Sequence, residues 1–112
     1  MQAQDMKHTA LRVSGVLKML SHRERLMALC HLIEGEMSAG ELGEALDMKP
    51  PAMSQQLSIL RREGAVTTRR EAQTIKYSIA DDDVRKIMHF LYETFCQPEG
   101  SESGPSEAGA RP

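Results

Sequence analysis

Residues 38–64 read SAGELGEALDMKPPAMSQQLSILRREG, and this stretch predicts two short helices joined by a few residues. Ser38 and Glu41 have the spacing of a capping box, in which the serine hydroxyl and the glutamate carboxylate satisfy free backbone amides at a helix start. The side chains expected to face inward from this first helix are Leu42, Ala45 and Leu46. We therefore expect a short helix that ends near Asp47.

The second helix of this stretch begins with two prolines. Pro50 and Pro51 suit a first helical turn, because the amides that proline lacks have no partner there. Apolar side chains recur at helical spacing as far as Gly64. These side chains are Met53, Leu57 and Leu60. Two short helices in this arrangement predict a helix-turn-helix.

The segment that follows Gly64 predicts a β-hairpin. Residues 66–70 and 74–79 are rich in β-forming side chains and roughly alternate, and the polar residues 71–73 separate them. We expect a two-stranded hairpin with a charged tip.

The region before residue 38 predicts two helices with apolar stripes. The stripe of the first, over about residues 7–20, consists of Val13, Val16, Leu17 and Leu20. Ser21 and Glu24 have capping-box spacing and predict the start of the second helix, which Gly35 would stop. Its stripe consists of Leu26, Leu29, Cys30 and Ile33. Cys30 is therefore expected on a buried face.

The region after the hairpin predicts one long final helix. Residues 81–83 are three aspartates, which place negative charge at a helix N-terminus, and Cys96 closes the helix. Its apolar stripe consists of Val84, Ile87, Met88, Leu91 and Phe95. The complete order is four helices, two strands and one helix. This order predicts a mainly α fold with a small β-hairpin, a winged helix-turn-helix.

The first and last helices carry longer stripes than so small a body can cover. We expect a second copy of the chain to cover them, giving a homodimer through the first and last helices. A monomer with ordinary helix packing is the alternative.

Composition is consistent with one domain. The chain has 112 residues, of which 40% are hydrophobic, so we expect a domain over residues 1–97. Residues 98–112 are rich in Pro, Gly, Ser and Glu and predict a disordered acidic tail. No membrane span or signal peptide is recognisable, so a cytoplasmic protein with no membrane partner is expected.

Charge is distributed unevenly along the chain. The formal net charge is -2, but residues 49–76 hold six Lys and Arg against two Glu, a net charge of +4. A basic middle suits double-stranded DNA as a partner.

DNA contacts are expected from the second helix of the helix-turn-helix and from the hairpin. Short polar side chains near the start of that helix can reach base edges in the major groove, and the hairpin arginines can bind phosphates. The predicted contact residues are Lys49, Ser54, Gln55, Ser58, Arg61, Arg69, Arg70 and Gln73. The alternative is that Ser and Gln simply solvate a surface helix.

The sequence gives little support for metal binding, a cofactor or catalysis. His22, His31 and His89 are isolated from one another, no cysteine pair has metal-ligand spacing, and a His89–Glu93 pair at helical spacing is more often simply solvated. No nucleophile-base pattern or phosphate-binding glycine loop is present. We expect neither a cofactor, nor a metal, nor an enzyme.

Cys30 and Cys96 are the only two cysteines. A cysteine on an apolar face is commonly core filler, whereas one at a helix end before a polar tail should be accessible to small oxidants. The residues alone leave both interpretations open for Cys30.

The sequence resembles the ArsR family of winged-helix repressors over about residues 8–97. The segments that carry the resemblance are LKMLSHRERLMALCHL, SAGELGEAL and MSQQLSILRREGAVTTRREAQTIKYSI. The cysteine in LC, the hairpin REAQTIKYSI and the cysteine in ETFC are similar to the sulfide- and persulfide-responsive (BigR/SqrR/HlyU-like) branch. Classic metal-sensing relatives carry ligand sets on the third or last helix that this chain lacks.

The resemblance implies a repressor with a redox switch. By that likeness, reactive sulfur species act as inducer and link Cys30 to Cys96 through a polysulfide or disulfide. The dimer then leaves its operator, and sulfide-detoxification genes are the implied targets. A metal- or metalloid-responsive repressor is the first alternative, and a winged-helix protein-interaction module is the second.

The chain departs from the family at the start of the second helix of the helix-turn-helix. Relatives commonly have Ser at the cap and at the position of Pro51, and His at the position of Gln56, whereas the cap residue here is Lys49. These differences bear on the operator sequence and on the cap, and Lys49 offers a phosphate contact in compensation.

Overall fold

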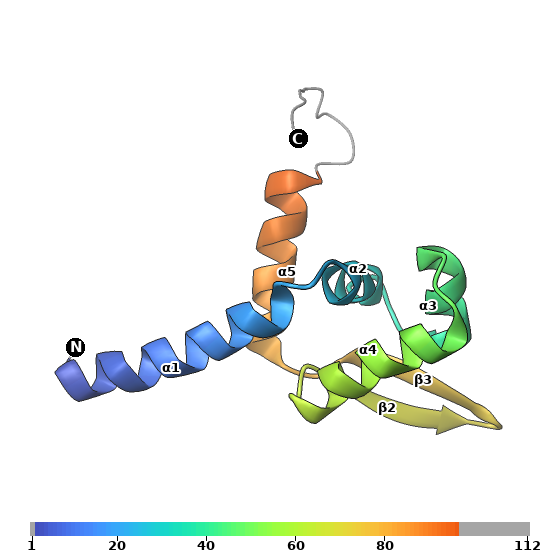
Figure 1. Ribbon diagram of the computed structural model, residues 1–112, viewed down its shortest axis with the longest axis horizontal. Coiled ribbons are helices and arrows are strands. Elements are labelled where there is room, and N and C mark those ends of the chain that lie inside the picture. Colours follow the sequence, from blue (N-terminus) through green and yellow to red (C-terminus); the bar gives the residue numbers. More distant parts are fainter. Residues whose placement is uncertain (1, 97–112) are drawn as a thin grey trace.

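The computed structural model describes residues 2–96, which form five helices and a three-stranded sheet (Figure 1). In chain order the elements are α1 (Ala3–Leu20), α2 (Arg23–Leu32), β1 (Met37–Ser38), α3 (Ala39–Leu46), α4 (Pro50–Arg62), β2 (Val66–Glu71), β3 (Thr74–Ile79) and α5 (Asp82–Phe95). The winged helix-turn-helix order is thus confirmed. The predicted acidic tail, residues 98–112, lies outside the described residues.

The helix-turn-helix forms from α3 and α4. The capping box is present: the Glu41 amide donates to the Ser38 hydroxyl over 3.1 Å, and the Ser38 amide donates to the Glu41 carboxylate over 2.8 Å. Asp47 ends α3 in the left-handed region with φ 57°, and the backbone turns there into α4. The expected inward position of Ala45 is wrong, because Ala45 is exposed while Leu42 and Leu46 are buried.

The turn between these helices leaves no room beside α3. A Cβ on the buried Gly43 would lie 3.0 Å from the backbone oxygen of Met48, whose amide donates to the Gly43 carbonyl over 2.8 Å. Glycine therefore allows the close approach of the turn to α3.

The sheet has one strand that the sequence did not predict. Its order is β1-β3-β2, with both pairs antiparallel, and Glu71 pairs with Thr74 across a two-residue turn that holds Ala72 at φ 58°. The additional strand β1 has two residues, too few to show an alternating pattern. It covers the outer edge of β3 and joins the wing to α3.

The start of α2 also differs from expectation. Ser21 does not cap it: its hydroxyl donates to the Lys18 carbonyl over 2.8 Å at the end of α1. The N-cap is His22, which makes no side-chain cap bond, although its Nδ1 lies 3.2 Å from the Glu24 carboxylate. The capping box predicted at Ser21 and Glu24 is wrong, because the end of the preceding helix takes up the serine hydroxyl.

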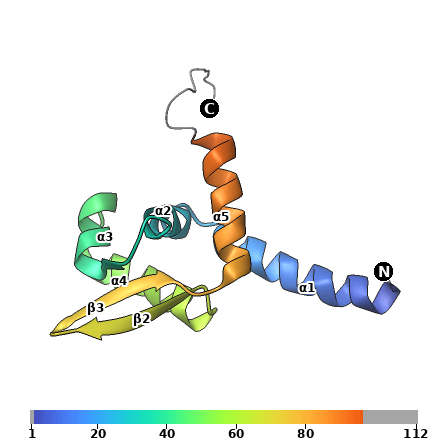
Figure 2. The same cartoon turned by 180° about the vertical axis from the view of Figure 1, so that it is seen from behind.

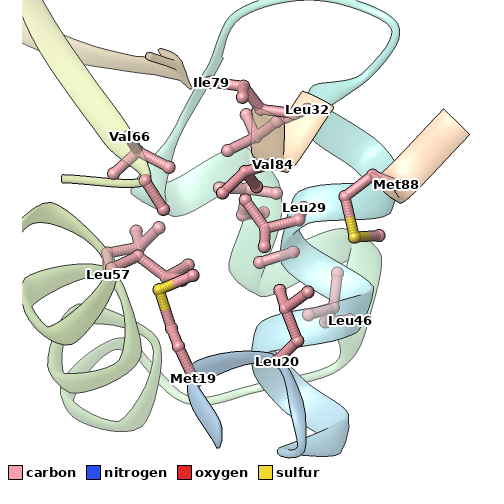
Figure 3. Close-up of a cluster of buried hydrophobic side chains, with 14 of the residues drawn as sticks. Met19, Leu20, Leu29, Leu32, Leu46, Leu57, Val66, Ile79, Val84 and Met88 are labelled. Carbon is pink, nitrogen blue, oxygen red and sulfur yellow. The ribbon is translucent and has the colours of Figure 1, made fainter. Parts of the chain in front are cut away.

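All helices except the outer parts of α1 and α5 contribute to one apolar core (Figure 3). Met19 and Leu20 at the end of α1 meet side chains from α2, α3, α4, the wing and the start of α5. The members with the largest fully buried side chains are Leu29, Leu32, Leu42, Met53, Leu57, Leu60, Val84 and Met88. No polar or charged side chain in residues 2–96 is buried.

The N-terminal part of α1 projects away from this body, as both views show (Figures 1 and 2). Its large apolar side chains Met6, Leu11, Val13 and Leu17 are 46–69% exposed. On α5, Phe90 and Phe95 are 65% and 77% exposed. Of the stripes that the sequence assigned to a dimer interface, Val13, Leu17 and Phe95 are therefore uncovered within one chain, whereas Leu20, Val84 and Met88 are buried in its core. In residues 2–96, no helix has the length and apolarity that a membrane crossing requires.

Candidate DNA-reading surface and thiol pair

Helix α4 presents a polar face opposite its buried stripe. Ser54, Gln55 and Ser58 are exposed, whereas Met53, Leu57 and Leu60 are buried. Lys49 is the exposed N-cap, makes no side-chain cap bond and precedes the two prolines. Arg61 is exposed in the last turn. The structure thus brings the five predicted α4 residues onto exposed positions of one helix and its cap.

Gln56 belongs to a different set of contacts on the same helix. It is half-buried, and its side-chain oxygen accepts a 3.0 Å hydrogen bond from Nη1 of Arg25 on α2. The Nε of the same guanidinium donates to the Met19 carbonyl at the end of α1 over 2.7 Å. One side chain therefore ties α1, α2 and α4 together. Arg25 was not predicted as a site residue, since nothing in its local pattern sets it apart from neighbouring arginines.

The two wing arginines have different surroundings. Arg69 donates from Nε and Nη2 to both carboxylate oxygens of Glu36, over 2.7 and 2.8 Å, and lies 3.6 Å from Glu71. These contacts raise the pKa of Arg69, and the Arg69 hydrogen bond lowers the pKa of Glu36. Arg70 has no carboxylate partner in residues 2–96 and donates to the Ala72 carbonyl over 3.2 Å.

The difference between the wing arginines affects their availability to DNA. Arg70 and Gln73 are exposed at the end of the wing, and the charge of Arg70 is not neutralised by a carboxylate of residues 2–96. Arg69 would have to share its guanidinium with Glu36. The sequence pattern alone predicts the same phosphate-binding role for both arginines.

The two thiols lie on packed helices. Cys30 is in the last turns of α2 and is half-buried, and Cys96 is the exposed C-cap of α5, where its amide donates to the Tyr92 carbonyl over 2.8 Å. Both are free thiols. Burial raises the pKa of Cys30, and the charge of the Cys96 thiolate acts in the same direction. The expectation of a buried Cys30 is thus only half met, because the residue packs against the core without being fully covered.

A cavity of about 300 Å³ adjoins Cys30 between α2 and α5. Its lining residues are Cys30, Ile33, Glu34, His89, Tyr92 and Glu93. The described part of the chain holds no group of three or more His, Cys, Asp and Glu side chains placed to bind a metal ion. His89 and Glu93 thus share a cavity with a thiol but not a metal-ligand cluster.

Five helices, one of which (α4) presents an exposed polar face, together with a wing define a winged helix-turn-helix DNA-binding protein. The sequence profile described as "Bacterial regulatory protein, arsR family" matches residues 22–68. A Biofilm growth-associated repressor of Agrobacterium fabrum is 47% identical over 94 residues, which are 84% of this chain and 80% of that protein. The chain belongs to the ArsR family.

Solved structures give the same result. Reduced HlyU from Vibrio cholerae superposes with a TM-score of 0.81 at 37% identity, covering 84% of this chain and 99% of that one. The transcriptional repressor BigR from Xylella fastidiosa superposes with a TM-score of 0.80 at 40% identity, covering 89% and 99%. The chain is therefore a transcriptional regulator of the BigR and HlyU type, and not an enzyme.

Proposed function

We propose that this regulator is a homodimeric repressor that leaves its operator when reactive sulfur species link Cys30 to Cys96. The observation that carries the proposal is the placement of the only two thiols of the chain on the packed helices α2 and α5, where the charge of the Cys96 thiolate acts on Cys30. One relative is named a repressor and one solved relative is described as reduced HlyU, which supports a regulator with a defined thiol state.

The DNA-reading surface in this proposal is the exposed face of α4 with the tip of the wing. Ser54, Gln55 and Ser58 would reach base edges in the major groove, where a recognition helix docks by its N-terminal residues. Lys49 and Arg61 lie at the two ends of the helix and would bind the phosphates that flank the groove.

The wing completes this surface with a smaller contribution. Arg70 and Gln73 extend it along the phosphate backbone, and Arg69 takes part while paired with Glu36. Sequence is read by α4 in this arrangement, and the wing adds affinity that depends on salt.

A second copy of the chain would cover the uncovered stripes. Burial of an exposed leucine or phenylalanine contributes about 1.5–3 kcal/mol, and α1 and α5 offer several such side chains in each copy. A two-fold dimer places two recognition helices one helical turn of DNA apart, which matches a palindromic operator.

The proposed chemistry needs a sulfane-sulfur donor, RSSH. One cysteine thiolate attacks the terminal sulfur of the donor, the donor S–S bond breaks, and RS⁻ leaves and takes up a proton. The second thiolate attacks the cysteine sulfur of the resulting persulfide, forms the disulfide and expels HS⁻. The two thiols are oxidised and the sulfane sulfur is reduced to hydrogen sulfide.

A second donor lengthens the link by one sulfur. It first extends the protein persulfide with loss of another RSH, and the closing attack then falls on the inner added sulfur and leaves a trisulfide. Disulfide and trisulfide links both join α2 to α5.

The link acts on DNA binding through the spacing of the two recognition helices. Helix α2 touches α3 and α4, and α5 carries part of the exposed apolar surface. A bond between α2 and α5 therefore shifts the position of the helix-turn-helix relative to the dimer interface. A coupling free energy of about 1–3 kcal/mol lowers operator affinity about 5- to 150-fold. Sulfide-detoxification genes are the proposed targets.

The test compares reduced and persulfide-treated protein by fluorescence anisotropy on DNA from its own promoter, with intact-mass and peptide mapping of the same samples. We expect the wild type to lose affinity as the Cys30–Cys96 link forms, and Cys30→Ser and Cys96→Ser to stay bound under the same treatment. Release of either variant by persulfide would overturn the paired-thiol mechanism. Elemental analysis of the purified protein checks the metal-responsive alternative.

A further inference from the structure

The cavity beside Cys30 bears on the proposed thiol switch if a small molecule binds in it. It lies between α2 and α5, and two of its six lining residues, Ile33 and Tyr92, offer apolar surface. A volume of about 300 Å³ is at the lower end of the range for small-molecule sites. The cavity therefore suits a short ligand.

Glu34 places a carboxylate in the lining of the cavity, and none of the six lining residues is Lys or Arg. A cationic group is favoured there, and a carboxylate-bearing ligand is repelled.

We infer that this cavity binds the sulfane-sulfur donor and selects a small donor that carries an ammonium group, such as an aminothiol persulfide, over an anionic one. The inference rests on the proposed function and names the inducer class for the same thiol pair. Ile33 and Tyr92 would contact the short carbon chain of the donor, Glu34 would hold its ammonium group, and its persulfide would meet the Sγ of Cys30.

Donor charge also acts on the attacking thiol. Burial raises the pKa of Cys30, which keeps little of it as thiolate. A cation bound beside it favours the thiolate, whereas an anion disfavours it further. A cationic donor is therefore favoured both in binding to the cavity and in reacting with Cys30.

The sulfur-transfer step balances with the donor alone. The Cys30 thiolate bonds to the terminal sulfur of RSSH, the donor S–S bond breaks, and the ammonium-bearing RS⁻ leaves and is protonated. Cys96 then attacks the Cys30 sulfur and expels HS⁻, which closes the disulfide.

The first test measures charge selection at Cys30 without persulfide chemistry. In the Cys96→Ser variant, Cys30 is the only thiol, and its rate of labelling by 2-aminoethyl methanethiosulfonate is compared with that by the anionic 2-sulfonatoethyl reagent at low ionic strength. Both rates are divided by those of a free small thiol. We expect a cation-to-anion ratio above one that falls about fivefold on adding Glu34→Gln.

The matched control is Glu44→Gln, which removes the same charge from an exposed position on α3, outside the lining of the cavity. It should leave the ratio unchanged. A normalised ratio near one in the parent variant, or an equal fall with both glutamine substitutions, would overturn the inference, since the selection would then be absent or due to overall charge.

The second test separates the inference from the proposed function. Wild-type protein receives cysteamine persulfide or 3-mercaptopropionate persulfide, and Cys30–Cys96 linking is followed by intact mass. Faster linking by the cationic donor, lost in Glu34→Gln, supports both proposals. Linking at equal normalised rates overturns the cavity inference and leaves the thiol switch in place, while no linking by either donor overturns the switch and the inducer assignment with it.

Discussion

The helix-turn-helix body and the outer parts of α1 and α5 (the arms) both carry apolar side chains at helical spacing, yet only the body covers all of its own. Leu57 on α4 is fully buried, whereas Leu17 on α1 is 55% exposed and Phe95 on α5 is 77% exposed. Leucine at helical spacing is therefore buried in one region and exposed in the other. The body forms the core, and the arms expose apolar area of the kind that marks an interaction surface.

The largest expected difference between the two regions comes from shortening one buried side chain of the body. Leu57→Ala leaves a cavity in the core and should lower the free energy of unfolding by about 2–5 kcal/mol in chemical denaturation at a fixed protein concentration. Ser58→Ala, on the exposed face of the same helix, should change it by about 0.5 kcal/mol at most. Equal losses would mean that α4 is not packed as described.

A charge on the arm should act on assembly instead. Leu17→Asp places a carboxylate in the exposed stripe of α1 and should weaken self-association about tenfold or more, measured by sedimentation equilibrium. Ser14→Asp introduces the same charge on α1 outside the stripe and is the control. If Leu17→Asp lowers the unfolding free energy of the monomer as strongly as Leu57→Ala does, the arm belongs to the body after all.

Arg25 joins the two regions and offers a finer probe. Arg25→Met removes its bonds to the Met19 carbonyl and to Gln56, so α4 loses its tie to the base of the arm. We expect the operator affinity of reduced protein to fall about fivefold to tenfold, a cost of about 1 kcal/mol, measured by anisotropy.

A double-mutant cycle with Gln56→Met isolates this tie. The two substitutions should be clearly non-additive, whereas Arg23→Met, an exposed change on the same helix, should add independently. Additive effects of Arg25→Met and Gln56→Met would show that the observed bond does not position α4.

The wing arginines should differ in the salt dependence of DNA binding. Arg70→Ala should reduce the slope of log affinity against log salt by about 1, as expected for one lost phosphate contact. Arg69→Ala should reduce it by less, because Glu36 already neutralises that guanidinium. Identical slopes for the two variants would contradict the difference in ion pairing between Arg69 and Arg70.

The smallest effect concerns acid stability. The pKa of Glu36 is lower in the folded chain than its ordinary value, so its pair with Arg69 stabilises the fold above that ordinary value and the contribution fades as pH falls through the folded value. Glu36→Gln should therefore lower the thermal midpoint slightly at pH 7, and by progressively less as the pH falls below the ordinary value for a glutamate. Because the pair is exposed, a shift of many degrees would be contrary to this assignment.

Local sequence signals predicted the fold well where one helix or hairpin decides its own conformation. The capping box at Ser38, the prolines of α4 and the alternation in the wing all act between near neighbours in sequence, and each produced the expected element. Errors arose where a residue had two possible partners. Ser21 could cap the next helix or close the previous one, and only the three-dimensional arrangement decides between these roles.

The site was less predictable for the same physical reason. Exposed positions on α4 follow from helical periodicity, but the bonds from Arg25 to Gln56 and from Arg69 to Glu36 join segments 31 and 33 positions apart. The cavity beside Cys30 likewise needs both α2 and α5. No local sequence pattern predicts contacts between segments so far apart in the chain.

The positions of the two thiols have a consequence for the lifetime of the protein. A link between Cys30 and Cys96 closes a loop that contains the whole of α3, α4 and the wing. In the chain-entropy description, closing a loop of this size disfavours the unfolded chain by about 4 kcal/mol if the native geometry is unstrained. Induced protein should therefore resist proteases better than reduced protein, so that repression returns by chemical reduction of existing molecules and does not have to wait for new synthesis.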